Sequence, residues 1–188
     1  MPEGDRRTRI ADAAIRLIGT AGARGLTHRA VDAEAKLPEG STTYYCKRRA
    51  ELLALALRRH AELDHVALSR LEAFLGERAS SPADLAGRLA PALATWLRAQ
   101  DGPQLAARIE LFLAASREPE LQAVVKESRK RFQTTLTAVL NAAGVADARV
   151  LAAALIALIE GLLLDRLRVG RETVRPAELE TLIRALLA

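Results

Sequence analysis

The 188-residue sequence predicts an all-α protein, and three observations support this fold class. Half of the residues are hydrophobic but only 3% are aromatic, and the apolar residues are mostly Ala and Leu, which favour helices. Apolar residues recur at three- and four-residue steps, which is the pattern of amphipathic helices. No segment shows the alternation that is typical of a strand. We therefore expect nine to ten helices, divided between an N-terminal three-helix head over residues 1–50 and a larger helical body over residues 51–188.

The first three predicted helices are separated by Gly and Pro. The first spans residues 5–21 with an apolar stripe and ends at Gly22. The second is short and follows Thr27, whose hydroxyl can accept a hydrogen bond from a free amide of the first turn. It ends before Pro38, because proline disfavours helical backbone in the residue that precedes it. A third helix over residues 39–46 is too short and polar to be stable alone, so neighbouring helices must hold it.

Six further helices are predicted in the rest of the chain. They cover residues 48–75, 81–97, 105–116, 119–141, 147–168 and 176–188, with Ser81 and Asp147 as N-caps. The segment 150–164 is the most apolar stretch, but its fifteen residues fall short of the about 20 that cross a bilayer. We expect it to be a helix buried on nearly every side, either as the core of a monomer or with a second subunit covering part of it.

The short segment 39–46 and the charge around it are typical of a nucleic-acid interface. Residues 1–60 contain twelve Lys or Arg and seven Asp or Glu, so the first third of the chain holds the entire net charge of +5. Such a field attracts phosphates and displaces their counterions. Residues 41–45 add three hydroxyl side chains and two tyrosines, which suit phosphate oxygens and base edges. Together these features predict a helix-turn-helix.

The same stretch resembles the DNA-binding head of the TetR family of transcriptional regulators. The residues that carry the resemblance lie at the family's spacing: Leu26-Thr27, Ala35, Leu37, Gly40-Ser41, Tyr44-Tyr45, Arg49 and Glu51-Leu52-Leu53. The resemblance covers about the first sixty residues. It implies a DNA-binding set that comprises Thr27, His28, Arg29, Glu39, Ser41, Thr42, Thr43, Tyr44, Tyr45, Lys47 and Arg49. Within it, Arg29, Ser41, Thr43, Tyr44 and Tyr45 are expected to face the major groove, and Thr27, Tyr45, Lys47 and Arg49 to bind phosphate.

Four positions depart from the family pattern, among them Thr43, which replaces a frequent tyrosine. Lys36 replaces a turn glycine, Asp32 replaces a small apolar residue and Cys46 replaces a phenylalanine that anchors the recognition helix. A lysine in left-handed backbone costs about 1 kcal/mol. We expect Cys46 to be buried as a small hydrophobe. These departures support an alternative, in which the chain is a helical interaction module of the same fold with impaired DNA reading.

The resemblance also implies a homodimer and a small-molecule effector bound in the body. Dimerisation would use the helices over 119–141 and 147–168 as a four-helix bundle, with Phe132, Leu136, Ala153, Ala157 and Gly161 at the interface. A polar pair interrupts an apolar stripe in the helix 48–75, and two aromatics could join it around a ligand. The candidate ligand-binding residues are thus His60, Asp64, Trp96 and Phe112, whereas Arg108, Glu110 and Arg117 are expected to be surface charges.

Several other classes are disfavoured. The three histidines and one cysteine show no metal-ligand spacing, and no Gly-rich phosphate loop follows a strand, so we expect no enzyme, metal or cofactor. The N-terminus has no apolar signal core, which favours a cytoplasmic protein with no membrane partner. The sequence therefore predicts a homodimeric regulator that binds double-stranded DNA at an inverted repeat, most simply a repressor released by a small molecule. The operator, the effector, the regulated genes and the sign of regulation stay open.

Overall fold

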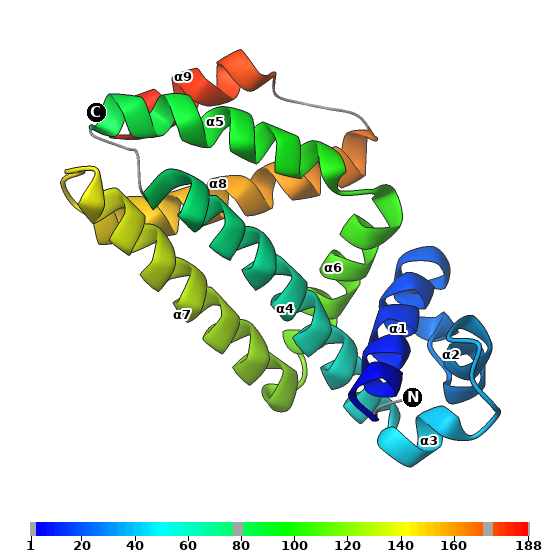
Figure 1. The fold of residues 1–188 in the computed structure, drawn as a ribbon. Helices are drawn as coiled ribbons and strands as arrows, with labels where there is room; N and C mark the ends of the chain where they lie inside the picture. The colour runs from blue at the N-terminus through cyan, green and yellow to red at the C-terminus, as the bar shows by residue number, and fades with distance from the viewer. Residues whose placement is uncertain (1–2, 77–80, 171–174, 188) are drawn as a thin grey trace. The chain divides into compact units, whose positions relative to one another are not determined.

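A computed structural model describes residues 3–76, 81–170 and 175–187 of the chain, and all of its regular elements there are helices (Figure 1). The fold class is thus confirmed as all-α. In chain order the helices are α1 (Glu3–Gly25), α2 (His28–Glu34), α3 (Ser41–Tyr45), α4 (Arg49–Gly76), α5 (Pro82–Ala99), α6 (Gly102–Ala115), α7 (Pro119–Ala142), α8 (Ala148–Val169) and α9 (Pro176–Leu187). In the described ranges, none of these helices is long and apolar enough to span a membrane.

The predicted helices are present, but several of their ends differ. Helix α1 is assigned through Gly25, although Gly22 itself has the non-helical backbone of the predicted end, and α3 begins at Ser41. Thr27 caps α2, because its hydroxyl accepts from the Ala30 amide at 3.1 Å, and Ser81 caps α5 through the Asp84 amide at 3.2 Å. The turn predicted before residue 105 is instead the first turn of α6, capped by Asp101. Asp147 stands at the N-cap of α8, but its side chain makes no capping hydrogen bond.

The chain forms two compact units, and these differ from the sequence-based division at residue 50. The first unit comprises residues 1–63 and 101–127, and the second comprises residues 64–100 and 128–188. Helices α4 and α7 each contribute to both units. The first unit therefore adds α6 to the three helices of the predicted head.

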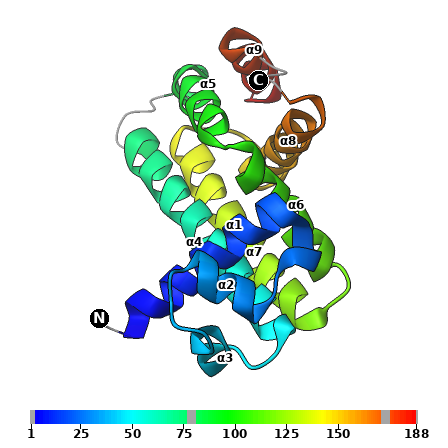
Figure 2. The same cartoon turned by 90° about the vertical axis from the view of Figure 1, so that its right-hand side faces the viewer.

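In the first unit, α1 packs against both α2 and α6 (Figure 2). Its core contains Ile10 and Ile18 from α1, Leu52 and Leu57 from α4, and Leu111 from α6, each no more than 2% exposed. The approach of α6 to α1 is close because Gly19 has no side chain. A Cβ on Gly19 would lie 2.0 Å from the Pro103 carbonyl oxygen.

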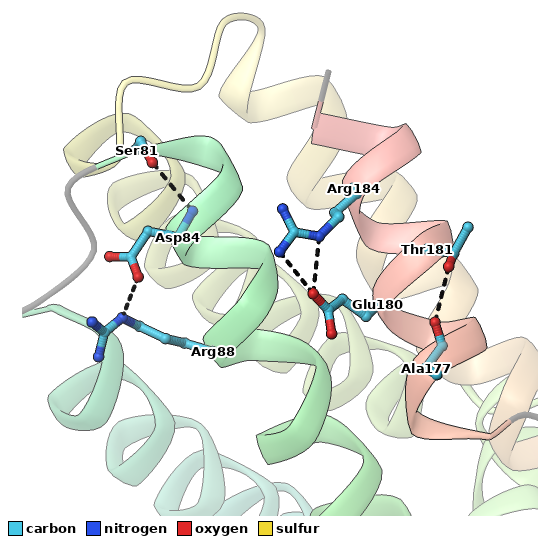
Figure 3. A network of polar contacts seen from close by, with 7 residues as sticks. All are labelled: Ser81, Asp84, Arg88, Ala177, Glu180, Thr181 and Arg184. Carbon is cyan, nitrogen blue, oxygen red and sulfur yellow. Dashed lines mark hydrogen bonds and ion pairs between the residues drawn. The ribbon is translucent and has the colours of Figure 1, made fainter.

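The second unit has its own core, built mainly by α5, α7, α8 and α9. Helices α5 and α9 lie side by side, and the Arg184 guanidinium of α9 lies beside Gly87 of α5. Figure 3 shows the polar contacts along this pair, including the ion pair of Arg184 with Glu180 at 2.7 Å. Arg166 of α8 donates to the Leu97 carbonyl at 2.8 Å and so satisfies the last turn of α5.

Within one chain, the segment 150–164 is not buried on nearly every side, so the alternative of a monomer core is wrong and the alternative of cover by a second subunit stays a prediction. One face of α8 is in the second core, including Ala152, Leu155 and Leu163. The opposite face is exposed, with Val150 at 67% and Leu164 at 43%. The apolar composition of this helix therefore reflects two different faces, one of which is not covered by any of the residues that the structure describes.

Candidate nucleic-acid interface

The connection between α2 and α3 depends on two residues with left-handed backbone. Gly40 precedes α3 with φ of 89°, a conformation that glycine adopts without steric cost. Lys36 has φ of 53°, so the position where the family usually has glycine does require left-handed backbone. The expected cost of about 1 kcal/mol is therefore present. Arg9 donates to the Ala35 carbonyl, and to the Lys36 carbonyl at 3.3 Å, which helps to hold this turn.

Asp32 lies at the centre of the contact between α2 and α3. It is only 3% exposed, and its Oδ2 accepts from the Gly40 amide at 2.8 Å. Its Oδ1 accepts from the Thr42 amide at 2.7 Å and from the Thr42 hydroxyl at 2.6 Å. Three hydrogen bonds to one carboxylate offset the cost of burying it. The departure at Asp32 is thus accommodated by a specific partner on the next helix.

Thr42 cannot serve as the predicted DNA contact in this structure. Its side chain is 0% exposed and its hydroxyl is used by Asp32. The sequence could not show this, because a threonine in a polar five-residue helix has no pattern that distinguishes its inner from its outer face. We therefore remove Thr42 from the candidate interface.

His28 also faces α3 rather than solvent alone. The ring is half-buried, and its Nε2 lies 2.7 Å from the Cys46 carbonyl oxygen, at the C-cap of α3. A carbonyl oxygen only accepts, so Nε2 carries a proton and donates. The structure thus gives His28 an intramolecular contact in place of the free orientation that a base contact needs.

The other candidates on α2 and α3 are accessible. Arg29 is 86% exposed at its side chain, with a long ion pair of 3.7 Å to Glu39, and Tyr44 is 75% exposed. Tyr44 and Tyr45 meet edge to face at 5.1 Å between ring centroids, while Tyr45 packs on the first core. The exposed or half-buried candidates are Thr27, Arg29, Glu39, Ser41, Thr43, Tyr44, Tyr45, Lys47 and Arg49.

The start of α4 carries further cations and fixes their backbone. Glu51 accepts from the Lys47 amide and from the Arg48 guanidinium, each at 2.8 Å. These contacts lower the pKa of Glu51, the Arg48 hydrogen bond most. The exposed Arg49 donates to the Ala23 carbonyl at the end of α1. The Lys47 backbone and the start of α4 are therefore fixed, and the side chains of Lys47 and Arg49 are exposed.

Cys46 is buried as expected and belongs to the first core. Burial raises the pKa of its thiol, an effect that the nearby Arg7 guanidinium opposes and Glu51 reinforces. A protonated, enclosed thiol packs as an apolar group and reacts slowly.

The residues predicted to bind a ligand fall in different surroundings. His60 is buried in the first unit, with its Nε2 3.5 Å from the Arg108 guanidinium, which lies 5.0 Å above the Phe112 ring. Arg108 is only 6% exposed, so its expected position on the surface is wrong. Asp64 and Trp96 are half-buried in the second unit, where Trp96 packs against the core.

The predicted dimer residues divide in the same way. Leu136 is 5% exposed and Phe132 packs against the second core and the His65 ring, so both side chains are used within the chain. Ala157 and Gly161 are exposed, and nothing lies within 4 Å of a Cβ placed on Gly161. Ala157 and Gly161 of α8 are therefore available to a partner, whereas Leu136 is not.

Two residues at these sites were not identified in their roles from the sequence. The family pattern marks Asp32 only as a departure, although an acid on the apolar side of α2, followed by a Gly-Ser helix start, signals a cap between the two helices. Arg108 gives no usable signal in the sequence, because an arginine on an amphipathic helix is most simply a surface charge. Among the residues that the structure describes, no group of three or more His, Cys, Asp or Glu could hold a metal ion.

Comparison with known proteins identifies the family to which this helical fold and its helix-turn-helix belong. Residues 80–188 match the model of the Tetracyclin repressor-like, C-terminal domain. A TetR-family protein of Streptomyces coelicolor is 36% identical with a TM-score of 0.75, and covers 100% of this chain and 99% of its own. The multidrug binding protein EbrR complexed with imidazole is 35% identical with a TM-score of 0.72, and the match covers 100% of this chain and 97% of EbrR. EbrR complexed with ethidium is 34% identical with a TM-score of 0.72, and the match covers 97% of this chain and 99% of EbrR.

No curated protein matches the chain. The family match covers more than half of the sequence, and the solved relatives cover essentially all of it. The chain belongs to the TetR family, whose members are DNA-binding transcriptional regulators.

Proposed function

We propose that the chain is a homodimeric repressor that binds an inverted-repeat operator through α2 and α3 and is released by a small molecule. The observation that carries the proposal is the accessible face of these helices. It presents a highly exposed arginine, an exposed tyrosine and hydroxyl groups next to the cations at the start of α4. A helix-turn-helix uses such a face to read base edges while the flanking cations hold phosphate.

Arg29 and Arg49 are assigned different tasks. Arg29 projects from α2 with its guanidinium in solvent, and it is our candidate for a bidentate contact to guanine. Arg49 lies at the start of α4, away from the reading face, and is assigned to phosphate. Because phosphates carry no sequence information, the two residues must differ in how their loss affects random DNA.

The experiment compares Arg29→Ala and Arg49→Ala on operator and random duplexes over a range of salt. Arg29→Ala is expected to cost about 1–3 kcal/mol at one base position. Arg49→Ala is expected to weaken both duplexes alike and to flatten the salt slope by about one unit. Equal losses on the two duplexes for both variants would refute this division of tasks.

Dimerisation is supported by the uncovered apolar face of α8, which includes Val150, Ala157 and Gly161. Small residues allow a second helix to approach closely, and exposed valine and leucine side chains gain from being covered. Two heads related by a two-fold axis would then read two half-sites of one operator. A sedimentation equilibrium mass of a single 20.3 kDa chain at micromolar concentration would contradict this part of the proposal.

The effector proposal is supported by the relatives, since EbrR binds ethidium, a planar aromatic cation. In this chain we retain His60 and Phe112 as candidate contacts, because both lie in the first unit beside the buried Arg108. Calorimetric titration with ethidium, repeated on His60→Ala, tests the assignment. Binding by the wild type that is unchanged in His60→Ala would end it.

The alternative of impaired DNA reading finds no supporting contact. The departures at Asp32, Lys36 and Cys46 are each accommodated, by three hydrogen bonds, by a tolerated left-handed turn and by burial. We therefore keep DNA reading as the proposed function of the head.

A further inference from the structure

Helix α3 has little apolar packing of its own. It contains five residues, and the only one fully buried is Thr42, which is polar. A helix of this length is not stable in isolation, because its nucleus fixes many dihedral angles for few hydrogen bonds. Its N-cap, Gly40, offers no side chain to accept from the free amides. The orientation of α3 must therefore depend on groups outside it.

Helix α2 supplies those groups at both ends of α3. Asp32 accepts from the Gly40 and Thr42 amides at the N-terminal end, at 2.8 and 2.7 Å. His28 donates to the Cys46 carbonyl at the C-terminal end, at 2.7 Å. The two residues are four apart, so they lie on the same face of α2. Figure 2 shows α2 and α3 as neighbours, joined by a short turn.

Each of these two contacts has the polarity that its end of α3 requires. The free N–H groups at the start of α3 meet a carboxylate, and the free carbonyl at its end meets an N–H. An apolar contact between α2 and α3 would allow α3 to slide or rotate, whereas hydrogen bonds of 2.6–2.8 Å at two points fix its direction. Because α3 carries Tyr44 and Thr43 on its exposed side, its direction decides where they meet a base pair.

We infer that Asp32 and His28 are positioning residues that clamp the recognition helix α3 at both ends, and that this clamp sets the sequence selectivity of DNA binding rather than its general strength. The inference rests on the proposed function of the head. The inference assigns the general affinity for DNA and the selectivity for one sequence to different residues. The cations at the start of α4 supply the affinity that all duplexes share, and the clamp supplies the difference between operator and random DNA.

The test uses Asp32→Asn, because its Nδ2 group donates and would face either the Gly40 amide or the two Thr42 donors, which then lose their acceptor. Thr42→Ser retains all three hydrogen bonds to Asp32 and serves as the conservative variant. The matched control is Asp12→Asn, because Asp12 is half-buried in the same unit and makes an ion pair of 2.8 Å with Arg59, away from α3. Both Asn variants remove a buried or half-buried carboxylate from the head. If Asp32 only stabilised the fold, the two variants would change the ratio of operator to random-DNA affinity alike.

Two quantities are measured in full-length protein: amide hydrogen exchange of residues 40–46, and the ratio of operator to random-DNA affinity. We expect Asp32→Asn to accelerate exchange and to lower the ratio at least about tenfold, with random-DNA affinity and salt slope unchanged. Thr42→Ser and Asp12→Asn should retain the wild-type ratio. His28→Ala should lower the ratio in the same direction.

An Asp32→Asn ratio equal to that of the wild type, or an equal fall in Asp12→Asn, would overturn the inference. If Asp32→Asn does not fold, Thr42→Val replaces it, because that variant loses only the hydroxyl bond to Asp32. Its ratio of operator to random-DNA affinity is expected to lie below that of Thr42→Ser, and equal ratios in the two variants would overturn the inference. A wild type that shows no preference for any duplex would instead contradict the proposed function. In that case amide hydrogen exchange still tests the clamp. Equal protection of residues 40–46 in the wild type and in Asp32→Asn would overturn the clamp.

Discussion

The contact between α1 and α6 provides a sharp prediction, because it depends on the absence of one side chain. In Gly19→Ala the new Cβ would lie 2.0 Å from the Pro103 carbonyl oxygen and 2.7 Å from its carbon, where ordinary contact begins at 3.4 Å. Both sides of this contact are backbone, so neither can move by rotation of a side chain. Helix α6 must therefore shift away from α1, or α1 must distort.

The magnitude follows from two opposing terms. Overpacking costs about 1–3 kcal/mol, and a backbone clash falls at the upper end. Alanine in a helix interior regains about 0.5–1 kcal/mol over glycine. We expect a net loss of about 2 kcal/mol in the free energy of unfolding, which corresponds to a fall of about 4–8 °C in Tm for a chain of this size.

The assay is urea and thermal unfolding followed by circular dichroism. The matched control is Gly102→Ala, because Gly102 adjoins Pro103 in the same turn and has nothing within 4 Å of a new Cβ. Gly102→Ala is expected to stay near wild-type stability. If Gly19→Ala were as stable as this control, the close approach of α1 and α6 would be refuted.

Three further predictions concern single residues. Lys36→Gly is expected to raise Tm by about 2 °C through relief of left-handed backbone, whereas Lys36→Ala should give no gain, as thermal unfolding would show. Because burial raises the pKa of the Cys46 thiol above its ordinary 9.0, the folded state favours the protonated form. Its contribution to stability is complete below pH 9.0 and is lost as pH rises further, so the stability advantage of wild type over Cys46→Ala, measured by urea unfolding, should shrink there. Val150→Glu is expected to shift the dimer towards monomer in sedimentation, while Val66→Glu, at an equally apolar exposed position on α4, should not; equal behaviour of the two would count against the α8 interface.

Much of the fold follows from short-range patterns in the sequence. Helices α2 and α5 begin directly after Thr27 and Ser81, because caps act over three or four residues. The start of α6 was placed too late, since Asp101 acts as a cap two residues before Pro103. Local chemistry of this kind can be read without knowing the tertiary structure.

Packing faces were harder to predict than helices. An apolar run such as 150–164 is compatible with burial on all sides or with two distinct apolar faces, and only the arrangement of neighbouring helices separates these cases. The burial of Arg108 likewise depends on α4 and α6 meeting across 48 residues of sequence. Long-range contacts of this type leave no periodic signal.

In the candidate interface, too, the sequence predicts some side-chain orientations and not others. The exposed positions of Arg29 and Tyr44 agree with the family pattern, since helix-turn-helix geometry fixes them. The inward orientation of Thr42 and His28 does not follow from that pattern. It depends on Asp32 and on the Cys46 carbonyl, which are specific to the contacts that this chain makes.

The central claim is that the head reads a specific DNA sequence as a symmetric pair. The most direct measurement is selection of binding sites from a random duplex pool with purified full-length protein at moderate salt. The account predicts enrichment of an inverted repeat whose half-sites lie about one helical turn or slightly more apart. A pool that fails to enrich with folded, dimeric protein would contradict it.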